Sequence, residues 1–364
     1  MSNTENFLNN INEYTLEKGI VFDCIKYSYS EIIQLSYNLS RLLESYPTKN
    51  IYFNLKNSPL VVCLYLSGFI ANIDSIIPIN PRLTAHELES ILERDSLLIT
   101  DVDNIVEPYI DEKNIQIQVI PNSMLFLNDI EITDNYTVHD KAIFTHISSG
   151  TSGKYKKHKH HSSQIINYAQ NEAKQLGLHN NDHLLIALSI NHAYAFSYQL
   201  LPALSMGLDI TIICEFDSKE ISILLQKCGI TAIALLPTMY YFLAHENIQN
   251  HALRYLSVAG DITTNYISQL VKDTFGKPLL VGIGMTEVFG YGQNTLETTN
   301  NNKIKIFDTT SIKIDKFDNC DYGNVYITNN MLPTWCNDDW LDTGDIGSYD
   351  KQSNELHFYG RYKD

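Results

Sequence analysis

The alternation of strand-like and helix-like segments constrains the fold of this chain most. Residues 30–45 carry apolar side chains at helical spacing. Segments 51–55, 58–71, 75–78, 84–95 and 97–100 then follow as strand, helix, strand, helix and strand. Thr84 and Glu87 form a capping-box pattern at the start of the last helix. Such alternation is typical of βαβ units, so the sequence predicts an α/β fold of stacked, mostly parallel sheets flanked by helices.

The same alternation resumes after residue 161. Helices are expected over residues 162–176, 194–205, 218–227, 238–245 and 264–275, and strands over 183–188, 209–213, 232–236, 255–258 and 278–283. Short alternating runs between residues 304 and 358 indicate a small antiparallel or barrel-like region. We therefore expect an α/β core over residues 1–303, with two subdomains divided near 145–215, and a β-rich subdomain over 304–364.

Composition narrows the class of protein. Of 364 residues, 44% are hydrophobic and 19% charged, which is typical of a globular protein. The net charge of −16 argues against nucleic-acid and acidic-membrane partners, because the field of the protein repels both. Six scattered cysteines without a C-x-x-C pair indicate reduced, mostly buried thiols. The polar N-terminus and short apolar runs lack the pattern of a secretory signal or membrane span, so a cytoplasmic location is expected.

Residues 148–153 are six consecutive small residues, followed at once by a cationic run up to His161. Backbone N–H groups in such a loop form a nest, and hydroxyl and lysine groups add donors and charge, as a nucleotide triphosphate requires. The loop is not a Walker A motif, because that motif needs Gly at position 148 and Ser or Thr at the position of Tyr155. The alternative is a disordered polar linker.

Three later segments carry further candidate chemistry. They are Gly284-Met285-Thr286-Glu287, Trp340-Leu341-Asp342-Thr343-Gly344-Asp345 and Gly360-Arg361-Tyr362-Lys363-Asp364. The first of them follows a predicted strand, as do Gly260 and Asp261 and the small-residue loop. Ligands in open α/β sheets bind beyond the carboxyl ends of the strands, so we expect these segments at one edge of a sheet.

In this order the motifs resemble those of the adenylate-forming superfamily, which includes acyl- and aryl-CoA synthetases, luciferases and adenylation domains of peptide synthetases. The residues that match its phosphate loop are Ser148, Ser149, Gly150, Thr151, Ser152, Gly153, Lys154 and Lys156. Tyr155 and Lys157 replace the usual proline and glycine. Weaker matches lie at residues 27–31 and 76–81, so the resemblance covers nearly the whole chain.

The resemblance implies that ATP and Mg²⁺ activate a carboxylic acid to an acyl-adenylate, for transfer to CoA or a carrier-protein thiol. It assigns the phosphate-loop residues to the β- and γ-phosphates, with Lys154, Thr286 and Glu287 as the catalytic set. Thr286 would contact the α-phosphate and Glu287 would hold Mg²⁺. Asp345 would accept the ribose hydroxyls, and Arg361 would reach the ribose or a phosphate. Gly260, Asp261, Gly284 and Met285 would lie along the nucleotide.

Each assignment has a structural alternative. Thr286 and Glu287 also fit a helix N-terminus, with Thr286 as the cap and Glu287 as a favourable first-turn charge. Asp345 also fits a turn, and Arg361 a surface position. His158, His160 and His161 are adjacent in a cationic segment, which is poor evidence for a metal site.

The acid pocket is expected around His192, in a segment that resembles one beside the acyl pocket of the superfamily. The residues expected to line it are His192, Tyr194, Phe196, Ile283 and Val288. An apolar pocket of this kind favours an aromatic or medium-chain aliphatic acid. No acidic residue near His192 offers a partner for an ammonium group, which makes amino-acid activation the weaker alternative.

In the superfamily, a small C-terminal domain with a catalytic lysine follows the position of Asp364. The resemblance therefore implies an adenylation core that needs this domain in trans or in a longer native chain. The alternative is a catalytically impaired nucleotide-binding, ligand-binding or scaffold protein descended from such an enzyme, with Tyr155 and Lys157 as marks of decay.

Overall fold

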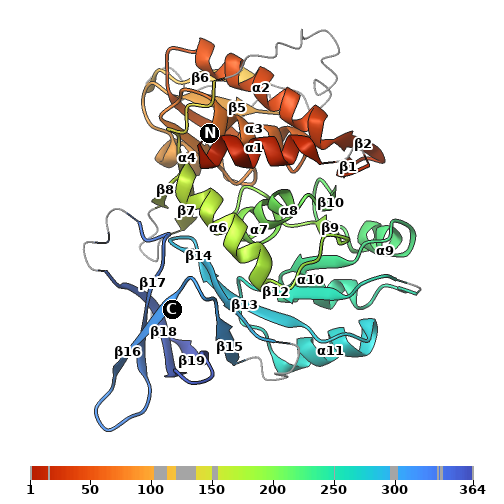
Figure 1. Cartoon of the computed structure of the whole chain (residues 1–364), viewed down its shortest axis with the longest axis vertical. Helices are drawn as coiled ribbons and strands as arrows, with labels where there is room; N and C mark the ends of the chain where they lie inside the picture. The colour runs from red at the N-terminus through yellow and green to blue at the C-terminus, as the bar shows by residue number, and fades with distance from the viewer. Residues whose placement is uncertain are drawn as a thin grey trace.

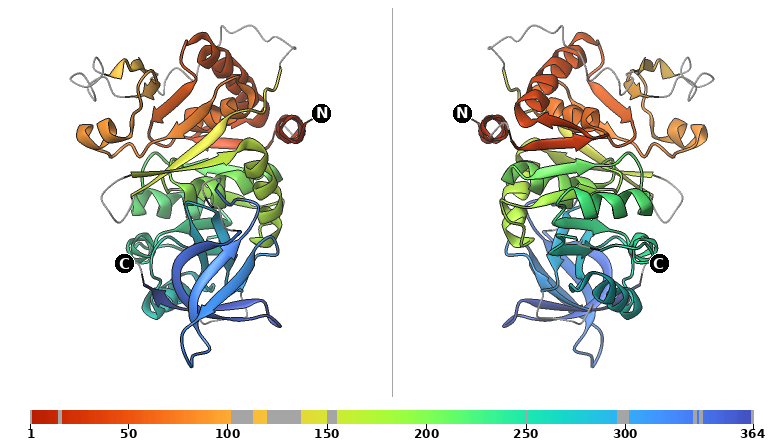
Figure 2. Two further views of the ribbon diagram at one scale, coloured as in Figure 1. Left: turned by 90° about the vertical axis from the view of Figure 1, so that its left-hand side faces the viewer. Right: turned by 90° about the vertical axis from the view of Figure 1, so that its right-hand side faces the viewer.

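The computed structural model describes residues 2–14, 17–101, 113–119, 137–149, 155–249, 251–295, 302–333, 336 and 339–362. Two β-sheets with helices on their faces form the molecule (Figure 1). The smaller sheet lies in the upper part of this view, and the larger one passes through the green and blue parts below it. The side views in Figure 2 show the same stacking of the two parts. The predicted α/β fold is confirmed.

The smaller sheet has the strand order β6-β5-β3-β4-β7-β8. Its strands are β3 (Asn50–Asn54), β4 (Ser75–Pro78), β5 (Leu97–Thr100), β6 (Gln116–Val119), β7 (Ile143–Ser149) and β8 (Tyr155–His161). All neighbours are parallel except β7 and β8, which pair antiparallel. Helices α1 (Asn3–Glu13), α2 (Tyr29–Ser45), α3 (Pro59–Ile70) and α4 (Ala85–Ile91) accompany it. Every residue of α3 is buried, because its side chains are apolar all round.

The larger sheet has the order β16-β17-β18-β19-β15-β14-β13-β12-β11-β9-β10-β1-β2. Its strands are β1 (Gly19–Phe22), β2 (Ile25–Ser28), β9 (His183–Ile186), β10 (Asp209–Ile212), β11 (Ala232–Leu235), β12 (Tyr255–Val258), β13 (Leu280–Met285), β14 (Phe289–Gln293), β15 (Lys303–Ile306), β16 (Ser311–Lys316), β17 (Gly323–Thr328), β18 (Leu341–Asp350) and β19 (Glu355–Arg361). Spatial neighbours between β13 and β1 in this order pair parallel. Spatial neighbours between β16 and β13 pair antiparallel.

Helices α6 (Ser162–Gln175), α9 (Ser218–Lys227), α10 (Pro237–Leu243) and α11 (Asn265–Phe275) accompany the larger sheet. The helix expected over residues 194–205 is interrupted: a π-helical segment, η2 (Phe196–Leu200), separates α7 (Ala193–Ala195) from α8 (Leu201–Met206). The predicted antiparallel region corresponds to β15–β19, which continue the larger sheet through β14. The division into residues 1–303 and 304–364 stays a prediction.

Buried side chains join the two sheets at the carboxyl ends of their strands. Asn57, which is 3% exposed and follows β3, donates from Nδ2 to Leu188 O at 2.8 Å and to Ile213 O at 3.2 Å. Its Oδ1 accepts from Ile190 N at 2.8 Å. Asn191 donates in return to Leu55 O at 2.7 Å. These bonds fix the strand ends of one sheet against those of the other.

The cysteines are all free, but the expectation that most are buried is wrong. Cys63 is buried, Cys24 and Cys228 are exposed, and the other three lie between these extremes. Within the described residues, no helix is both long and apolar enough to cross a membrane.

Glu172 gives the fold a pH dependence. Its side chain on α6 is 1% exposed and accepts a hydrogen bond from Thr309 Oγ1 at 2.8 Å, while Oε2 has no partner among the described residues. Burial raises the pKa of Glu172 to about 8, against the smaller, opposite effect of the Thr309 hydrogen bond. The folded state therefore binds this proton more tightly than the unfolded state does. The contribution of Glu172 to the unfolding free energy is fully present below the ordinary carboxyl pKa, and it is lost as the pH rises to about 8.

We expect Glu172→Gln, which imitates the protonated carboxyl, to gain about 1–3 kcal/mol in unfolding free energy at pH 8 over wild type, and little at pH 4.5. Urea unfolding at pH 4.5, 6 and 8 measures this difference. The exposed Glu13→Gln is the matched control and should show no such trend. Parallel stability curves for wild type and Glu172→Gln would contradict the assignment.

Candidate active site

Three cavities meet at Gly260, beyond the carboxyl ends of parallel strands of both sheets. We name them after one lining residue each: the Arg82 cavity of about 460 Å³, the Tyr198 cavity of about 220 Å³ and the Asp345 cavity of about 250 Å³. Gly260 lines all three and has φ +84°, a conformation that favours glycine. Thr286 is shared by the first two, and Gly284 by the last two.

The Asp345 cavity contains a buried carboxylate paired with an arginine. Asp345 on β18 is 3% exposed, and its Oδ1 accepts from Arg361 Nε at 2.8 Å. Its Oδ2 accepts from the Tyr291 hydroxyl at 3.1 Å. Burial raises the pKa of Asp345, while the Arg361 charge and the hydroxyl bonds act in the opposite direction. The strand register Asp345↔Arg361 brings the two motifs together, and Asp261 lines the same cavity.

A β-turn presents Thr286 and Glu287 between β13 and β14. Gly284 and Met285 belong to β13, which ends two residues later than the predicted strand. The alternative of a helix N-terminus is wrong, because β14 returns antiparallel. Gly284 is required for close approach: a Cβ there would lie 2.8 Å from Phe289 O. The Glu287 side chain is 19% exposed, and Thr286 lines the Arg82 and Tyr198 cavities.

The predicted phosphate loop is placed in part. Ser148 and Ser149 are the last residues of β7, and Lys156 is exposed near the start of β8. Gly150, Thr151, Ser152, Gly153 and Lys154 lie outside the described residues. The cationic run that follows is a strand, because residues 155–161 pair with β7. Alternation along that strand buries His158 and His160.

Two of the five residues expected to line the acid pocket line the Tyr198 cavity, namely Tyr194 and Ile283. His192 lines the neighbouring Arg82 cavity, as Tyr194 also does. Phe196 and Val288 are completely buried and line none of the three cavities. Glycines shape the floor of the Tyr198 cavity, because a Cβ on Gly290 would lie 2.7 Å from the Tyr198 ring.

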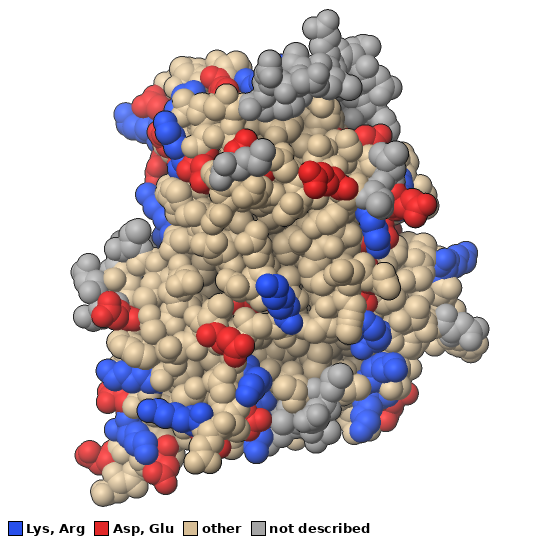
Figure 3. Space-filling model, viewed as in Figure 1, with Lys and Arg blue, Asp and Glu red and all other residues tan. Residues whose placement is uncertain are grey.

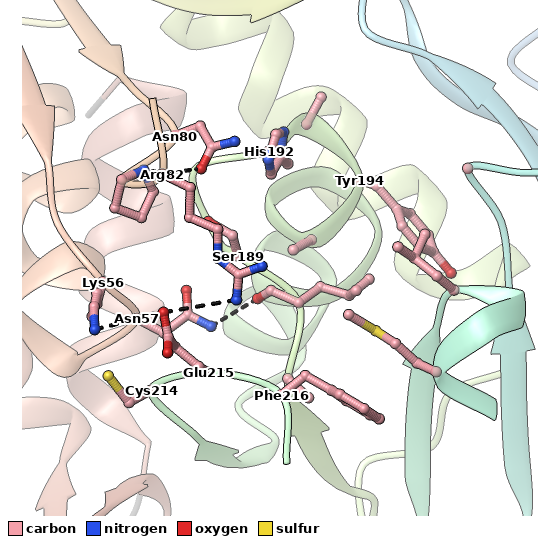
Figure 4. Close-up of a pocket in the computed structure, with 18 of the residues that line it drawn as sticks. Lys56, Asn57, Asn80, Arg82, Ser189, His192, Tyr194, Cys214, Glu215 and Phe216 are labelled. Carbon is pink, nitrogen blue, oxygen red and sulfur yellow. Dashed lines mark hydrogen bonds and ion pairs between the residues drawn. The ribbon is translucent and has the colours of Figure 1, made fainter. Parts of the chain in front are cut away.

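The Arg82 cavity has a charged end that the sequence pattern did not indicate (Figure 4). Lys56 Nζ and Arg82 Nη2 lie 3.6 Å and 3.7 Å from Glu215 Oε1. The three residues follow β3, β4 and β10, so they come together only when the two sheets pack. Tyr194 and His192 lie toward the other end of the cavity.

Magnesium fits the donors at this site. Within the described residues, no group of three or more His, Cys, Asp or Glu side chains is arranged to hold a metal ion. Glu287 offers one partly exposed carboxylate in the turn that also carries Thr286. Mg²⁺ is usually held in this way, by one or two protein oxygens together with phosphate oxygens and water.

Charged side chains of both signs are interspersed over the described surface of the face in Figure 3, without a large patch of one sign. Local cationic groups that an anionic ligand could meet include Arg82 and Arg361, which line two of the cavities.

Comparisons with known proteins identify related sequences and related folds. The 2-succinylbenzoate–CoA ligase of Lactococcus lactis subsp. lactis (strain IL1403) is 24% identical over 142 residues, 39% of this chain and 31% of that protein. The 4-coumarate–CoA ligase 1 of Arabidopsis thaliana is 24% identical over 271 residues, 64% of this chain and 48% of that protein. The chain thus spans 31% and 48% of the length of these two curated relatives.

Solved structures show the same fold. A benzoate CoA ligase from Burkholderia xenovorans LB400 superposes with a TM-score of 0.86 at 19% identity, over 100% of this chain and 81% of that one. The O-succinylbenzoate coenzyme A synthetase from Bacillus subtilis, in complex with ATP and magnesium ion, gives 0.82 at 19% identity, over 99% and 80%.

The order of the strands in the two sheets agrees with the fold of these solved structures. The AMP-binding enzyme family matches residues 9–314. The chain belongs to this family.

Proposed function

We propose that this chain is the adenylation core of an acid–thiol ligase, which uses ATP and Mg²⁺ to convert a carboxylic acid into an acyl-adenylate. The observation that carries the proposal is the meeting of three cavities around Gly260, with Thr286 and Gly284 at their boundaries. A nucleotide, an acid and a thiol can each reach this point from a different side. The family match and the relatedness to CoA ligases support the same reaction.

In this proposal the adenosine occupies the Asp345 cavity. Asp345 accepts the ribose hydroxyls with its remaining lone pairs, and the Arg361 charge opposes the rise in its pKa that burial causes. Gly260 and Asp261 lie along the base, and Gly284 and Met285 let the α-phosphate approach the β13 backbone. The triphosphate extends toward Ser148, Ser149 and the loop residues Gly150, Thr151, Ser152, Gly153 and Lys154, with Lys156 beside them.

The acid occupies the Tyr198 cavity, so that its carboxylate lies beside Thr286. One carboxylate oxygen attacks the α-phosphorus, the new C–O–P bond forms, and pyrophosphate leaves with the electrons of the broken P–O bond. The Thr286 hydroxyl donates to the α-phosphate, and Lys154 stabilises the charge that develops. Bound Mg²⁺, held by Glu287, would neutralise phosphate oxygens.

We propose an aromatic or medium-chain aliphatic acid, because Tyr194, Tyr198 and Ile283 line the Tyr198 cavity. Its volume of about 220 Å³ suits a small acid. The Arg82 cavity is the proposed route for the thiol of CoA or a carrier protein, since it reaches Thr286 from the side of the smaller sheet. A C-terminal domain supplied by a longer native chain or a partner would complete this second step.

ATP–pyrophosphate exchange across a panel of aromatic and aliphatic acids tests the proposal. We expect exchange that depends on one class of acid, slow for this chain alone. ATP binding by calorimetry without exchange would assign the missing step to a lysine-bearing domain from elsewhere. Absence of both would favour the alternative, a scaffold protein derived from such an enzyme.

A further inference from the structure

The cationic run after the phosphate loop is strand β8, and its two faces differ. Lys159 is exposed on one face, whereas on the other face His158 is 1% and His160 0% exposed. Antiparallel pairing with β7 sets His158 opposite His146 and His160 opposite Phe144. Burying imidazole groups is unfavourable unless they gain partners, so these positions call for a physical reason.

The inward side chains of β8 contact both halves of the candidate active site. His158 Nε2 lies 2.8 Å from Ser148 Oγ, at the end of β7, and 3.7 Å from Glu287 Oε1, in the turn after β13. His160 Nε2 lies 3.3 Å from Thr286 O in the same turn. The Thr286–Glu287 turn lies more than one hundred residues further along the chain than β7 and β8. Strand β8 therefore links two segments that the chain alone does not hold together.

The hydrogen-bond partners of His158 and His160 determine which ring nitrogen carries the proton. A carbonyl oxygen only accepts, so the bond to Thr286 requires a proton on His160 Nε2. Burial lowers the pKa of His160 to about 4, which leaves the ring neutral. The Glu287 carboxylate beside His158 Nε2 likewise favours a proton on that nitrogen. Ser148 Oγ then accepts from His158, and its own proton stays available to a phosphate oxygen.

The turn itself needs external support. Phe289, directly after it, has φ +62°, which is costly for an aromatic residue. Its ring is 2% exposed and packs at 4.6 Å from His160 and 5.3 Å from His146, between ring centroids. The histidines therefore hold the turn through its backbone, through the Glu287 side chain and through the strained residue that follows.

We propose that His158 and His160 are positioning residues, which fix the Thr286–Glu287 turn against the start of the phosphate loop so that both face one Mg²⁺–triphosphate. The inference rests on the proposed function. It gives the alternation along β8 two separate roles, with Lys159 in solvent and His158 and His160 as a link inside the site.

Four variants at His158 and His160, with calorimetry of ATP binding in the presence and absence of Mg²⁺, test the proposal. The amide nitrogen of a Gln side chain lies near the position of the histidine Nε2, whereas that of an Asn side chain lies only as far out as Nδ1. We therefore expect His158→Gln and His160→Gln to bind MgATP nearly as wild type does, and His158→Asn and His160→Asn about tenfold or more weaker. Lys159→Gln, on the exposed face of β8, is the control and should change nothing.

The Mg²⁺-dependent part of the affinity should fall most in His158→Asn, because that contact touches Glu287. Thermal unfolding of each ligand-free variant separates site geometry from folding: the Gln and Asn variants should melt at similar temperatures while their affinities differ. Equal MgATP affinity in Gln and Asn variants would overturn the inference. Failure of wild type to bind MgATP would overturn the proposed function instead.

Discussion

Glu287→Gln is expected to lower acid-dependent ATP–pyrophosphate exchange by about 100-fold, because it removes the negative charge assigned to Mg²⁺ without changing the shape of the side chain. The amide keeps one oxygen near His158, so the turn should remain in place. Affinity for ATP without Mg²⁺ should be unchanged or slightly higher, since a carboxylate no longer faces the triphosphate. Exchange assays over a range of Mg²⁺ concentrations measure the effect.

The matched control is Asp321→Asn, which removes a fully exposed carboxylate from the β16–β17 hairpin. Its ion pair with Lys316, at 3.3 Å, lies in solvent and should contribute little. Exchange and Mg²⁺ dependence should therefore match wild type. Normal exchange by Glu287→Gln at low Mg²⁺ would show that another residue holds the metal. A reduced Tm of this variant would indicate a structural role for Glu287.

Periodicity predicted the parallel core well, since burial on both faces makes such strands continuous apolar runs. The bounds of β4, β5, β12 and α9 coincide with the predicted ones. Strand β8 was missed, because lysine and histidine are not typical of strands and only pairing with β7 gives them alternate faces. Strand β14 was missed for a similar reason: its Gly290 packs closely against Tyr198 and Tyr168, a contact that no local pattern reveals.

In the candidate site, too, the sequence indicated some of the residues and missed others. Thr286, Asp345 and Arg361 stand in short motifs that are visible in the sequence, and they line the cavities around Gly260. Glu287 follows Thr286 in the same turn. The Arg82 cavity could not be located from the sequence, since its charged residues come from three strand ends that meet through sheet packing. The histidines of β8 carried a signal, the two-residue spacing of His158 and His160, which is informative only once the segment is known to be a strand.

Asp345→Ala is expected to weaken ATP binding by about 100-fold, because it removes the acceptor for two ribose hydroxyls, and hydrogen bonds to charged groups contribute roughly 1.5–3 kcal/mol each. It also leaves Arg361 without the carboxylate that its Nε contacts at 2.8 Å. The conservative control is Tyr291→Phe, which removes only the hydroxyl bonded to Oδ2 and keeps the buried ring. This change should weaken binding only a few-fold.

A double-mutant cycle with 2′,3′-dideoxy-ATP isolates the ribose contact from any general damage to the cavity. Wild type should prefer ATP over the dideoxy analogue by about 10- to 100-fold, and Asp345→Ala should bind both equally weakly. Tyr291→Phe should keep most of the preference. If Asp345→Ala still discriminates between the two nucleotides, Asp345 does not hold the ribose, and its buried pair with Arg361 serves to fix β18 against β19.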